Sequence, residues 1–150
     1  MKPQLGYWNI RGLGAPIRML LHYCDVSFDD VRYEQGDAPT FSLAAWLGRK
    51  HTLDLELPNL PYFIDEHGGF VQTIAIMHHI AAVYAPREQG GLGHDEPRAH
   101  MMAQAAMDLR NAFVRCSYGS RTAEDVALVV EQSIAPQLAT WNELMASGRH

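Results

Sequence analysis

The chain of 150 residues has a mass of 16.8 kDa, which allows one domain with an appendage and excludes two large lobes. Hydrophobic residues make up 47% of the sequence and charged residues 19%, so we expect a packed core and exclude a disordered chain. The formal net charge of −5 argues against a nucleic-acid-binding surface, and no apolar run reaches the length of a membrane span.

Cysteine use and the start of the chain predict a cytoplasmic protein. The two cysteines, Cys24 and Cys116, are too few for a disulfide scaffold and show no C-x-x-C spacing. No apolar segment typical of a signal peptide follows Lys2. We therefore expect a soluble chain in a reducing compartment, with no membrane partner.

The beginning of the chain predicts a strand, a helix and a second strand. Gln4–Trp8 is a short run with aromatic residues that ends at turn residues, which is typical of a buried strand. Pro16 suits the first position of the following helix, because its missing N–H has no consequence there. Apolar and charged residues roughly alternate over 28–33, which predicts a half-exposed strand.

The next segment predicts a helical turn, two strands and a helix. The turn covers residues 46–50, and prolines bracket the entry to a strand at 62–64. A further strand is expected at 70–71, and apolar residues at helical spacing predict a helix over Thr73–Tyr84. The order is therefore βαβ followed by ββα.

Glycine and proline over residues 85–95 predict a linker, so we place one domain at 1–84 and a partial helical domain at 96–150. In the second part, apolar residues repeat at three-to-four spacing on two helices joined by a turn at 117–121. Thr122 is predicted to cap the second of these helices, and Pro136 is predicted to bend it.

Two further motifs have spacings that do not support the functions they suggest. Gly12-Leu13-Gly14 follows a strand, but no third glycine stands at the offset that a dinucleotide loop needs. His78 and His79 are adjacent on a predicted helix, and neither has a histidine or carboxylate four residues further on. We interpret both histidines as ordinary helix residues and predict no metal site.

Tyr7 and Trp8 end the first strand, close to the start of the predicted helix. Two aromatic side chains at a strand end are by themselves typical of core packing. In this context, however, the phenol of Tyr7 would lie beside free backbone N–H groups at a helix N-terminus. A neutral O–H donor next to such amides suits an anion, and a thiolate is one.

Separated motifs, in the same order along the chain, closely resemble the mu class of the glutathione S-transferases. They are Leu5-Gly6-Tyr7-Trp8-Asn9-Ile10-Arg11-Gly12-Leu13, Gly36-Asp37-Ala38-Pro39, Trp46-Leu47 with Lys50, Leu57-Pro58-Asn59-Leu60-Pro61-Tyr62 and Gln72-Thr73. The likeness continues more weakly through the helices, at Met107-Asp108 and Tyr118.

The resemblance implies an α/β thioredoxin-like N-terminal domain followed by an all-α C-terminal domain. That second domain would be incomplete, because members of the class continue for several helices beyond the position of His150. The resemblance also implies a cis peptide bond before Pro61. The implied activity conjugates the glutathione thiolate to hydrophobic electrophiles and needs no cofactor, since glutathione is a co-substrate.

The resemblance assigns roles to individual residues. Tyr7 would be the catalytic residue, donating its hydroxyl proton to the glutathione sulfur. Residues implied in glutathione binding are Trp8, Trp46, Lys50, Asn59, Leu60, Gln72, Thr73 and Asp108, the last reaching the glutathione of the partner subunit in a homodimer. Leu13 and Tyr118 would contact the electrophile. Taken alone, Lys50 and Asp108 are typical of solvated charges, and Tyr118 of a half-buried packing residue.

Some residues depart from the pattern of the class. Leu57 replaces a phenylalanine that inserts into the neighbouring subunit, and His78 replaces an arginine at the dimer interface, so the dimer's affinity is open. Thr73 replaces a serine but keeps the hydroxyl. These departures and the short helical part leave an alternative function: a ligand-binding or glutathione-binding module with little turnover, or a truncated remnant that acts by dimerisation.

Overall fold

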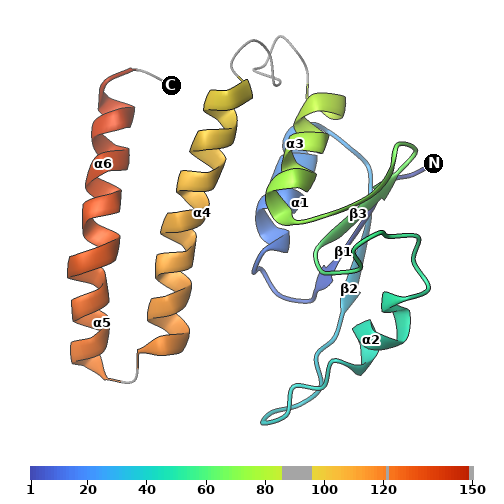
Figure 1. Ribbon diagram of the computed structural model, residues 1–150, viewed down its shortest axis with the longest axis horizontal. Coiled ribbons are helices and arrows are strands. Elements are labelled where there is room, and N and C mark those ends of the chain that lie inside the picture. Colours follow the sequence, from blue (N-terminus) through green and yellow to red (C-terminus); the bar gives the residue numbers. More distant parts are fainter. Residues whose placement is uncertain (86–95, 121, 149–150) are drawn as a thin grey trace. The chain divides into compact units, whose positions relative to one another are not determined.

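The computed structural model describes residues 1–85, 96–120 and 122–148 (Figure 1). The chain divides into two compact units, Met1–Glu96 and Pro97–His150. The linker predicted at 85–95 lies, apart from Ala85, outside the described residues. The domain boundaries placed at 84 and 96 therefore stay a prediction.

The first unit is built on a four-stranded sheet in the order β2-β1-β3-β4. Strand β1 (Gln4–Trp8) runs parallel to β2 (Asp29–Tyr33) and antiparallel to β3 (Tyr62–Asp65), which pairs in turn with antiparallel β4 (Gly68–Val71). Parallel neighbours need a crossover, and helix α1 (Gly14–Tyr23) provides it between β1 and β2. This is the thioredoxin-like α/β arrangement that the sequence predicts.

The main core lies between the sheet and two helices, α1 and α3 (Thr73–Tyr84), which pack against each other (Figure 1). The spacing of four residues between Ile17 and Leu21, and between Ile76 and Ile80, places each pair on one helix face. Fully buried side chains from the helices and the sheet form one cluster: Leu5, Ile17, Leu21, Phe63, Ile76 and Ile80.

A second cluster lies on the other face of the sheet, because successive strand residues point to opposite sides. Tyr62 packs there with Tyr33, with Leu55, and with Trp46 of helix α2 (Ala44–Lys50). The hydroxyls of Tyr33 and Tyr62 hydrogen-bond to each other at 3.0 Å. Burial, and then this hydrogen bond, raise the pKa of Tyr62 far above its ordinary value, so the phenol stays neutral inside the cluster.

The second unit is helical, as the sequence predicts. Helix α4 (Glu96–Gly119) is followed by α5 (Ala123–Val129), a π-helical segment η2 (Val130–Ile134) and α6 (Ala135–Ala146). The predicted cap is confirmed: the Thr122 hydroxyl accepts from the backbone N–H of Asp125 at 3.1 Å, and the Asp125 carboxylate accepts from the Thr122 N–H at 3.0 Å. Pro136 is the second residue of α6, just beyond the π-helical segment, and the bend predicted at this proline stays a prediction.

Several element bounds differ from the predictions. Helix α1 begins at Gly14, so Pro16 is its third residue, where the missing N–H is still among the four that have no partner within a helix. Helix α4 continues to Gly119, into the turn predicted at 117–121, and the Ser117 hydroxyl donates to the Phe113 carbonyl within it at 2.9 Å. Helix α2 and strand β4 each begin two residues earlier than expected, at Ala44 and Gly68.

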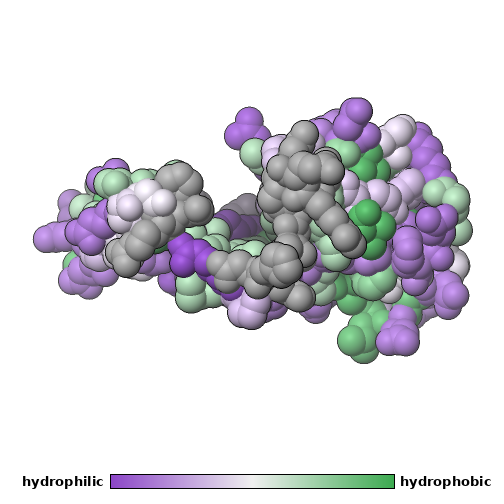
Figure 2. Space-filling view, turned by 90° about the horizontal axis from the view of Figure 1, so that it is seen from above, coloured by the Kyte–Doolittle hydropathy of each residue, from purple (hydrophilic) through white to green (hydrophobic). Residues whose placement is uncertain are grey.

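The surface mixes polar and apolar side chains. On the face drawn in Figure 2, hydrophobic residues lie among hydrophilic ones. Leu57 in the first unit is 71% exposed and Tyr118 in the second is 86% exposed. Within the described ranges, no helix combines the length and the apolar character needed to cross a membrane.

Candidate functional site

Tyr7 is buried near the end of β1, and its hydroxyl meets the start of α1. The phenol oxygen accepts a hydrogen bond from the backbone N–H of Leu13, with the two atoms 3.1 Å apart, and Leu13 is the residue before the helix. Because this N–H uses a lone pair and not the hydroxyl proton, the phenol keeps its proton for another acceptor. The predicted placement of the phenol beside a helix N-terminus is confirmed.

Two glycines allow the turn before α1 to approach the Tyr7 ring. A Cβ atom at Gly12 would lie 2.7 Å from the Tyr7 hydroxyl oxygen, and a Cβ atom at Gly14 would lie 2.7 Å from Cδ1 of the ring. Gly12 also has a φ of +35°, in the left-handed region that favours glycine. The Gly12-Leu13-Gly14 motif therefore holds the loop against a phenol, which accounts for its two glycines without a dinucleotide.

The loop before β3 contains the predicted cis peptide bond between Leu60 and Pro61. The backbone N–H of Leu60 donates to Oδ1 of Asn59 at 2.9 Å. This amide is the one expected to face a bound peptide, and here a neighbouring side chain already satisfies it. The Asn59 side chain is exposed, and binding of a peptide carbonyl at this amide stays a prediction that would require this side chain to rotate away.

Helix α3 presents an N-terminus without a side-chain cap. Its N-cap residue, Gln72, has a φ of +71°, a strained conformation for a residue with a side chain, and such strain concentrates at functional sites. The Gln72 carbonyl accepts the N–H of Ile76 at 2.9 Å, whereas the first N–H groups of a helix have no intrahelical acceptor. Free amides and the helix dipole at buried Thr73 favour an anion there.

The remaining residues predicted to bind glutathione in the first unit are two tryptophans of the second cluster and a lysine of α2. Trp46 is 5% exposed and stacks on Tyr62, with ring centroids 6.1 Å apart, so it contributes to the core. Trp8 is half-buried and meets Tyr33 edge-on, with centroids 6.4 Å apart. Lys50 is the half-buried last residue of α2. No ligand contact tests these three roles, which stay predictions.

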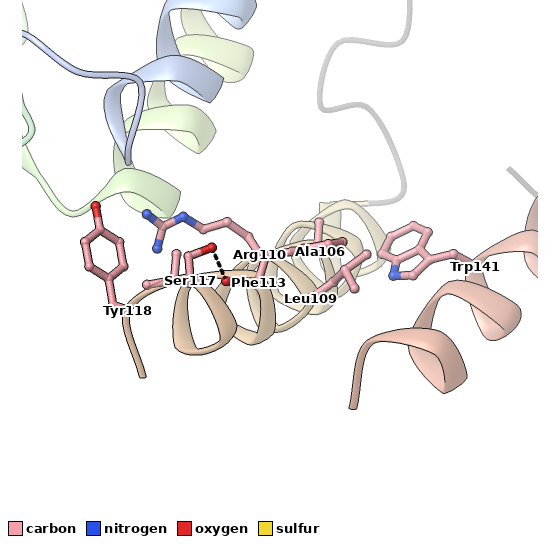
Figure 3. Close-up of a pocket in the computed structure, with 8 residues that line it drawn as sticks. Ala106, Leu109, Arg110, Phe113, Ser117, Tyr118 and Trp141 are labelled. Atoms are coloured by element: carbon pink, nitrogen blue, oxygen red, sulfur yellow. Dashed lines mark hydrogen bonds between the residues drawn. The ribbon is translucent and has the colours of Figure 1, made fainter. Parts of the chain in front are cut away.

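Asp108 and Tyr118 lie on α4 in the second unit, whereas Leu13 lies in the first. Asp108 is exposed. Tyr118 lines a groove of about 500 Å³ whose other walls come from α4 and from Trp141 of α6 (Figure 3). The pairing of Leu13 with Tyr118 in one electrophile site stays a prediction.

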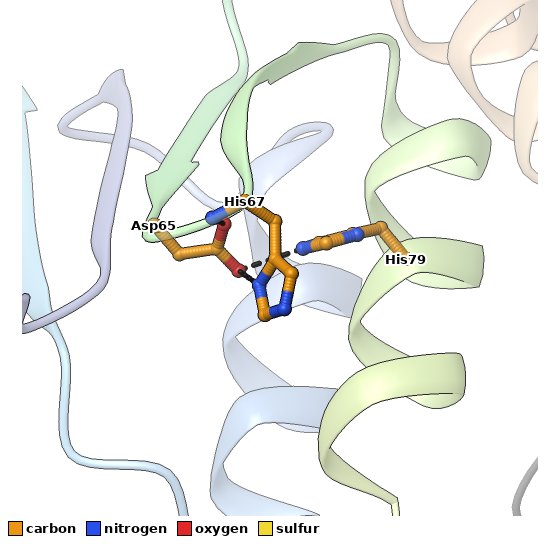
Figure 4. A group of neighbouring side chains, drawn as sticks. All are labelled: Asp65, His67 and His79. Atoms are coloured by element: carbon orange, nitrogen blue, oxygen red, sulfur yellow. Dashed lines mark hydrogen bonds and ion pairs between the residues drawn. The ribbon is translucent and has the colours of Figure 1, made fainter.

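A buried carboxylate that sequence reasoning did not single out lies at the end of β3. Asp65 Oδ2 is 2.7 Å from Nε2 of His79 and 2.8 Å from the Tyr84 hydroxyl, while Oδ1 accepts the backbone N–H of His67 at 2.8 Å (Figure 4). Burial by itself raises the pKa of Asp65, but these hydrogen bonds outweigh it and hold that pKa below its ordinary value.

The sequence did not reveal this partner of His79, and the interpretation of His79 as an ordinary helix residue stays a prediction. Its carboxylate partner is not four residues along the helix but on the strand beneath it, 14 residues earlier. The sequence did contain a signal for this pair: an aspartate at the end of a predicted strand, followed by a tight turn, a second strand and a predicted helix with a histidine. Only the pairing of the helix with the sheet brings the two groups together.

The sequence of this chain is similar to those of known proteins. Residues 3–82 match the family described as "Glutathione S-transferase, N-terminal domain". A glutathione S-transferase of Dermatophagoides pteronyssinus is 43% identical over 117 residues, which are 78% of this chain and 52% of that protein. Glutathione S-transferase Mu 1 of Mus musculus is 42% identical over 114 residues, 76% of this chain and 51% of that protein.

The fold matches solved structures as well. The crystal structure of the glutathione S-transferase Blo t 8 superposes with a TM-score of 0.73 at 29% identity, covering 97% of this chain and 64% of that one. The chain spans about half the length of the curated relatives it matches.

Proposed function

Since the chain belongs to the glutathione S-transferase family through its residues 3–82, we propose that it binds glutathione and transfers the glutathione sulfur to hydrophobic electrophiles, as an enzyme of the mu class. The observation that carries the proposal is the position of Tyr7. Its buried phenol oxygen accepts the Leu13 N–H, and its proton remains free for a thiolate. No cofactor takes part, because glutathione itself supplies the nucleophile.

Tyr7 is the catalytic residue, and its effect can be estimated. A thiol with a pKa of about 8.5 is roughly 3% ionised at pH 7, and lowering that pKa by two units makes it about 75% ionised. The shift requires a differential interaction of about 2.7 kcal/mol. A hydrogen bond to a charged group contributes about 1.5–3 kcal/mol, so one phenol donor suffices for most of it.

The rest of the first unit binds the tripeptide. The uncapped N-terminus of α3, at Gln72 and Thr73, receives the γ-glutamyl carboxylate, since free amides and the helix dipole both favour an anion. Lys50 pairs with the glycine carboxylate, and the Leu60 N–H binds the cysteinyl carbonyl once Asn59 releases it. Trp8 and Trp46 shape the wall beside the peptide from the second cluster.

For contact with the electrophile we propose Leu13 of the first unit and Tyr118 of the second. The Tyr118 side chain is 86% exposed, so its hydroxyl is accessible to an oxyanion that develops during epoxide opening or addition to an enone. The apolar groove beside it on α4, with Phe113 and Trp141, suits a hydrophobic substrate.

The chain acts as a homodimer in which Asp108 reaches the partner's glutathione. The exposed Leu57 supports a subunit contact, because a leucine side chain that is 71% exposed gains from burial against a second copy. The exposed position of Asp108 is compatible with contact outside its own subunit.

Both cysteines are free thiols, which supports a cytoplasmic location.

Replacing Tyr7 with phenylalanine tests the proposal. Tyr7→Phe keeps the ring between Gly12 and Gly14 and removes only the donor, so glutathione affinity should change little. Turnover of an activated chloronitroarene at pH 7 should fall about 25-fold, the ratio of the two ionised fractions above. The deficit should shrink as the pH rises from 7 and be nearly gone at about pH 9, because the thiolate then forms without help.

Tyr23→Phe is the matched control, because Tyr23 lies on α1 and is 59% exposed. It should leave both affinity and turnover unchanged. Full activity of Tyr7→Phe at pH 7 would refute the assignment of Tyr7. Retention on immobilised glutathione without any conjugation by the unmodified chain would instead support the alternative, a glutathione-binding module with little turnover.

A further inference from the structure

A group of one carboxylate and two imidazole side chains lies at the opposite end of β3 from the predicted glutathione site. Leu60 lies before the first residue of β3, whereas Asp65 is its last residue, so the two stand at opposite ends of the strand. His67 follows in the turn between β3 and β4, and His79 lies in the middle of α3. None of these three residues takes part in the function proposed above.

The three side chains converge on one point (Figure 4). Each offers one ligand atom, and all three atoms lie within 4.8 Å of one another. His79 Nε2 is 2.7 Å and His67 Nδ1 is 3.6 Å from the same oxygen, Oδ2 of Asp65. The second distance is too long for a hydrogen bond, so a hydrogen bond to the carboxylate does not account for the position of the His67 ring.

These spacings are close to those of a zinc site. Ligand bonds of about 2.0–2.1 Å in a tetrahedral site place neighbouring ligand atoms about 3.3–3.4 Å apart. The distances of 2.7 and 3.6 Å from Asp65 Oδ2 lie on either side of that value. To admit an ion, His79 Nε2 must move slightly away from Asp65 Oδ2 and His67 Nδ1 slightly toward it. The exposed position of His67 gives freedom for the second movement.

Burial and orientation also favour a bound ion. The Asp65 side chain is fully buried, that of His79 is 12% exposed and that of His67 is 47% exposed, so solvent reaches the cluster from one side. Phe70 stacks on the His79 ring with centroids 3.9 Å apart, and the backbone N–H of His67 holds the other carboxylate oxygen. Such surrounding contacts orient ligands in metal sites.

From this geometry we propose that Asp65, His67 and His79 form a site for one Zn²⁺ ion. Two imidazole nitrogens and one carboxylate oxygen are ligands that zinc prefers. Coordination requires Nε2 of His79 to carry no proton, so the ion replaces the hydrogen bond between His79 and Asp65, and the Tyr84 hydroxyl keeps its hydrogen bond to the carboxylate. Three protein ligands leave a fourth position for water.

Metal titration of the full 150-residue chain, prepared without a histidine tag, tests the proposal. We expect calorimetry to give one Zn²⁺ per chain, and Co²⁺ to produce the visible absorption of a low-coordinate N/O site. His67→Gln and His79→Gln should each weaken Zn²⁺ binding at least as much as loss of a supporting contact does, roughly 10–100-fold. Glutamine at position 79 still donates to Asp65, so the fold should be preserved.

His51→Gln is the matched control, because His51 is an exposed histidine after α2 and should not affect binding. Unchanged Zn²⁺ affinity in both His67→Gln and His79→Gln would overturn the proposal, as would the absence of binding to the unmodified chain. A thiolate charge-transfer band with Co²⁺ would also overturn it, since the ligands would then be Cys24 or Cys116. Conjugating activity plays no part in these readouts, so the glutathione proposal stands or falls separately.

Discussion

At the scale of single residues, close approaches decide which side chains are permitted. Gly6 lies on β1 under the Tyr62 ring, and a Cβ atom there would be 2.1 Å from two ring atoms. Tyr62 has no room to move, because it is 1% exposed and its hydroxyl bonds to Tyr33 and to Gln4. The absence of a side chain at position 6 therefore permits the second cluster to form.

Gly6→Ala should consequently destabilise the fold by about 2–3 kcal/mol, the upper range for overpacking a well-packed core. Urea unfolding monitored by tryptophan fluorescence measures this difference, since Trp46 stacks on Tyr62. Gly48→Ala is the control: no atom lies within 4 Å of the added Cβ, and the residue is inside α2, so a gain of up to about 1 kcal/mol is expected. Equal stability of the two variants would contradict the argument.

At the same scale, the sequence indicated the chemistry of Tyr7 but not its immediate surroundings. A tyrosine at the end of a strand and before a helix can be recognised in the sequence. The hydrogen bond from the Leu13 N–H to its hydroxyl depends on the exact conformation of the turn between the strand and the helix. The Leu60 amide is a similar case. Its position followed from the resemblance, but its occupation by Asn59 is a local conformational choice.

At the scale of elements, the residues that cap the end of a helix can be recognised directly in the sequence. The capping box of α5 joins Thr122 and Asp125 through two hydrogen bonds. Both partners lie within one turn of each other, so the motif needs no tertiary contact. The cap at Thr122 was predictable for that reason. The bounds of β1 and α3 were also predicted correctly, from the patterns of apolar residues along the chain.

Thr122→Ala should destabilise α5 by about 1 kcal/mol, because one of its first N–H groups loses its acceptor. Hydrogen exchange of the α5 amides should accelerate accordingly, about fivefold if they exchange through local opening. Thr122→Ser keeps the hydroxyl and should exchange like the unmodified chain. Faster exchange in the serine variant as well would mean that the methyl group, not the cap, stabilises this helix.

At the scale of the whole molecule, the proposed homodimer depends on an exposed apolar side chain. Leu57→Glu should shift the chain from dimer to monomer, because a carboxylate resists burial in a subunit contact. Sedimentation velocity over a range of concentrations measures the change. Met19→Glu is the control, an equally exposed apolar residue at 72% that lies on α1.

A dimer unaffected by Leu57→Glu would show that this position lies outside the subunit contact. A monomeric unmodified chain would refute the dimer itself. In either case the assignment of Tyr7 is unaffected, because its hydrogen bond to Leu13 lies within one subunit.

The sequence by itself determined the order of the elements and the family, and the resemblance to that family implied the thioredoxin-like class of the first unit. Each of these depends on local patterns: strand alternation, helical spacing, and short motifs whose residues are near neighbours in the chain. The tertiary structure decided what lies between elements, including the packing of Trp46 on Tyr62 and the approach of His79 to Asp65. Contacts of that kind depend on how α2 and α3 settle on the sheet, and the free energy of that packing is shared among many side chains, so no single stretch of sequence specifies it.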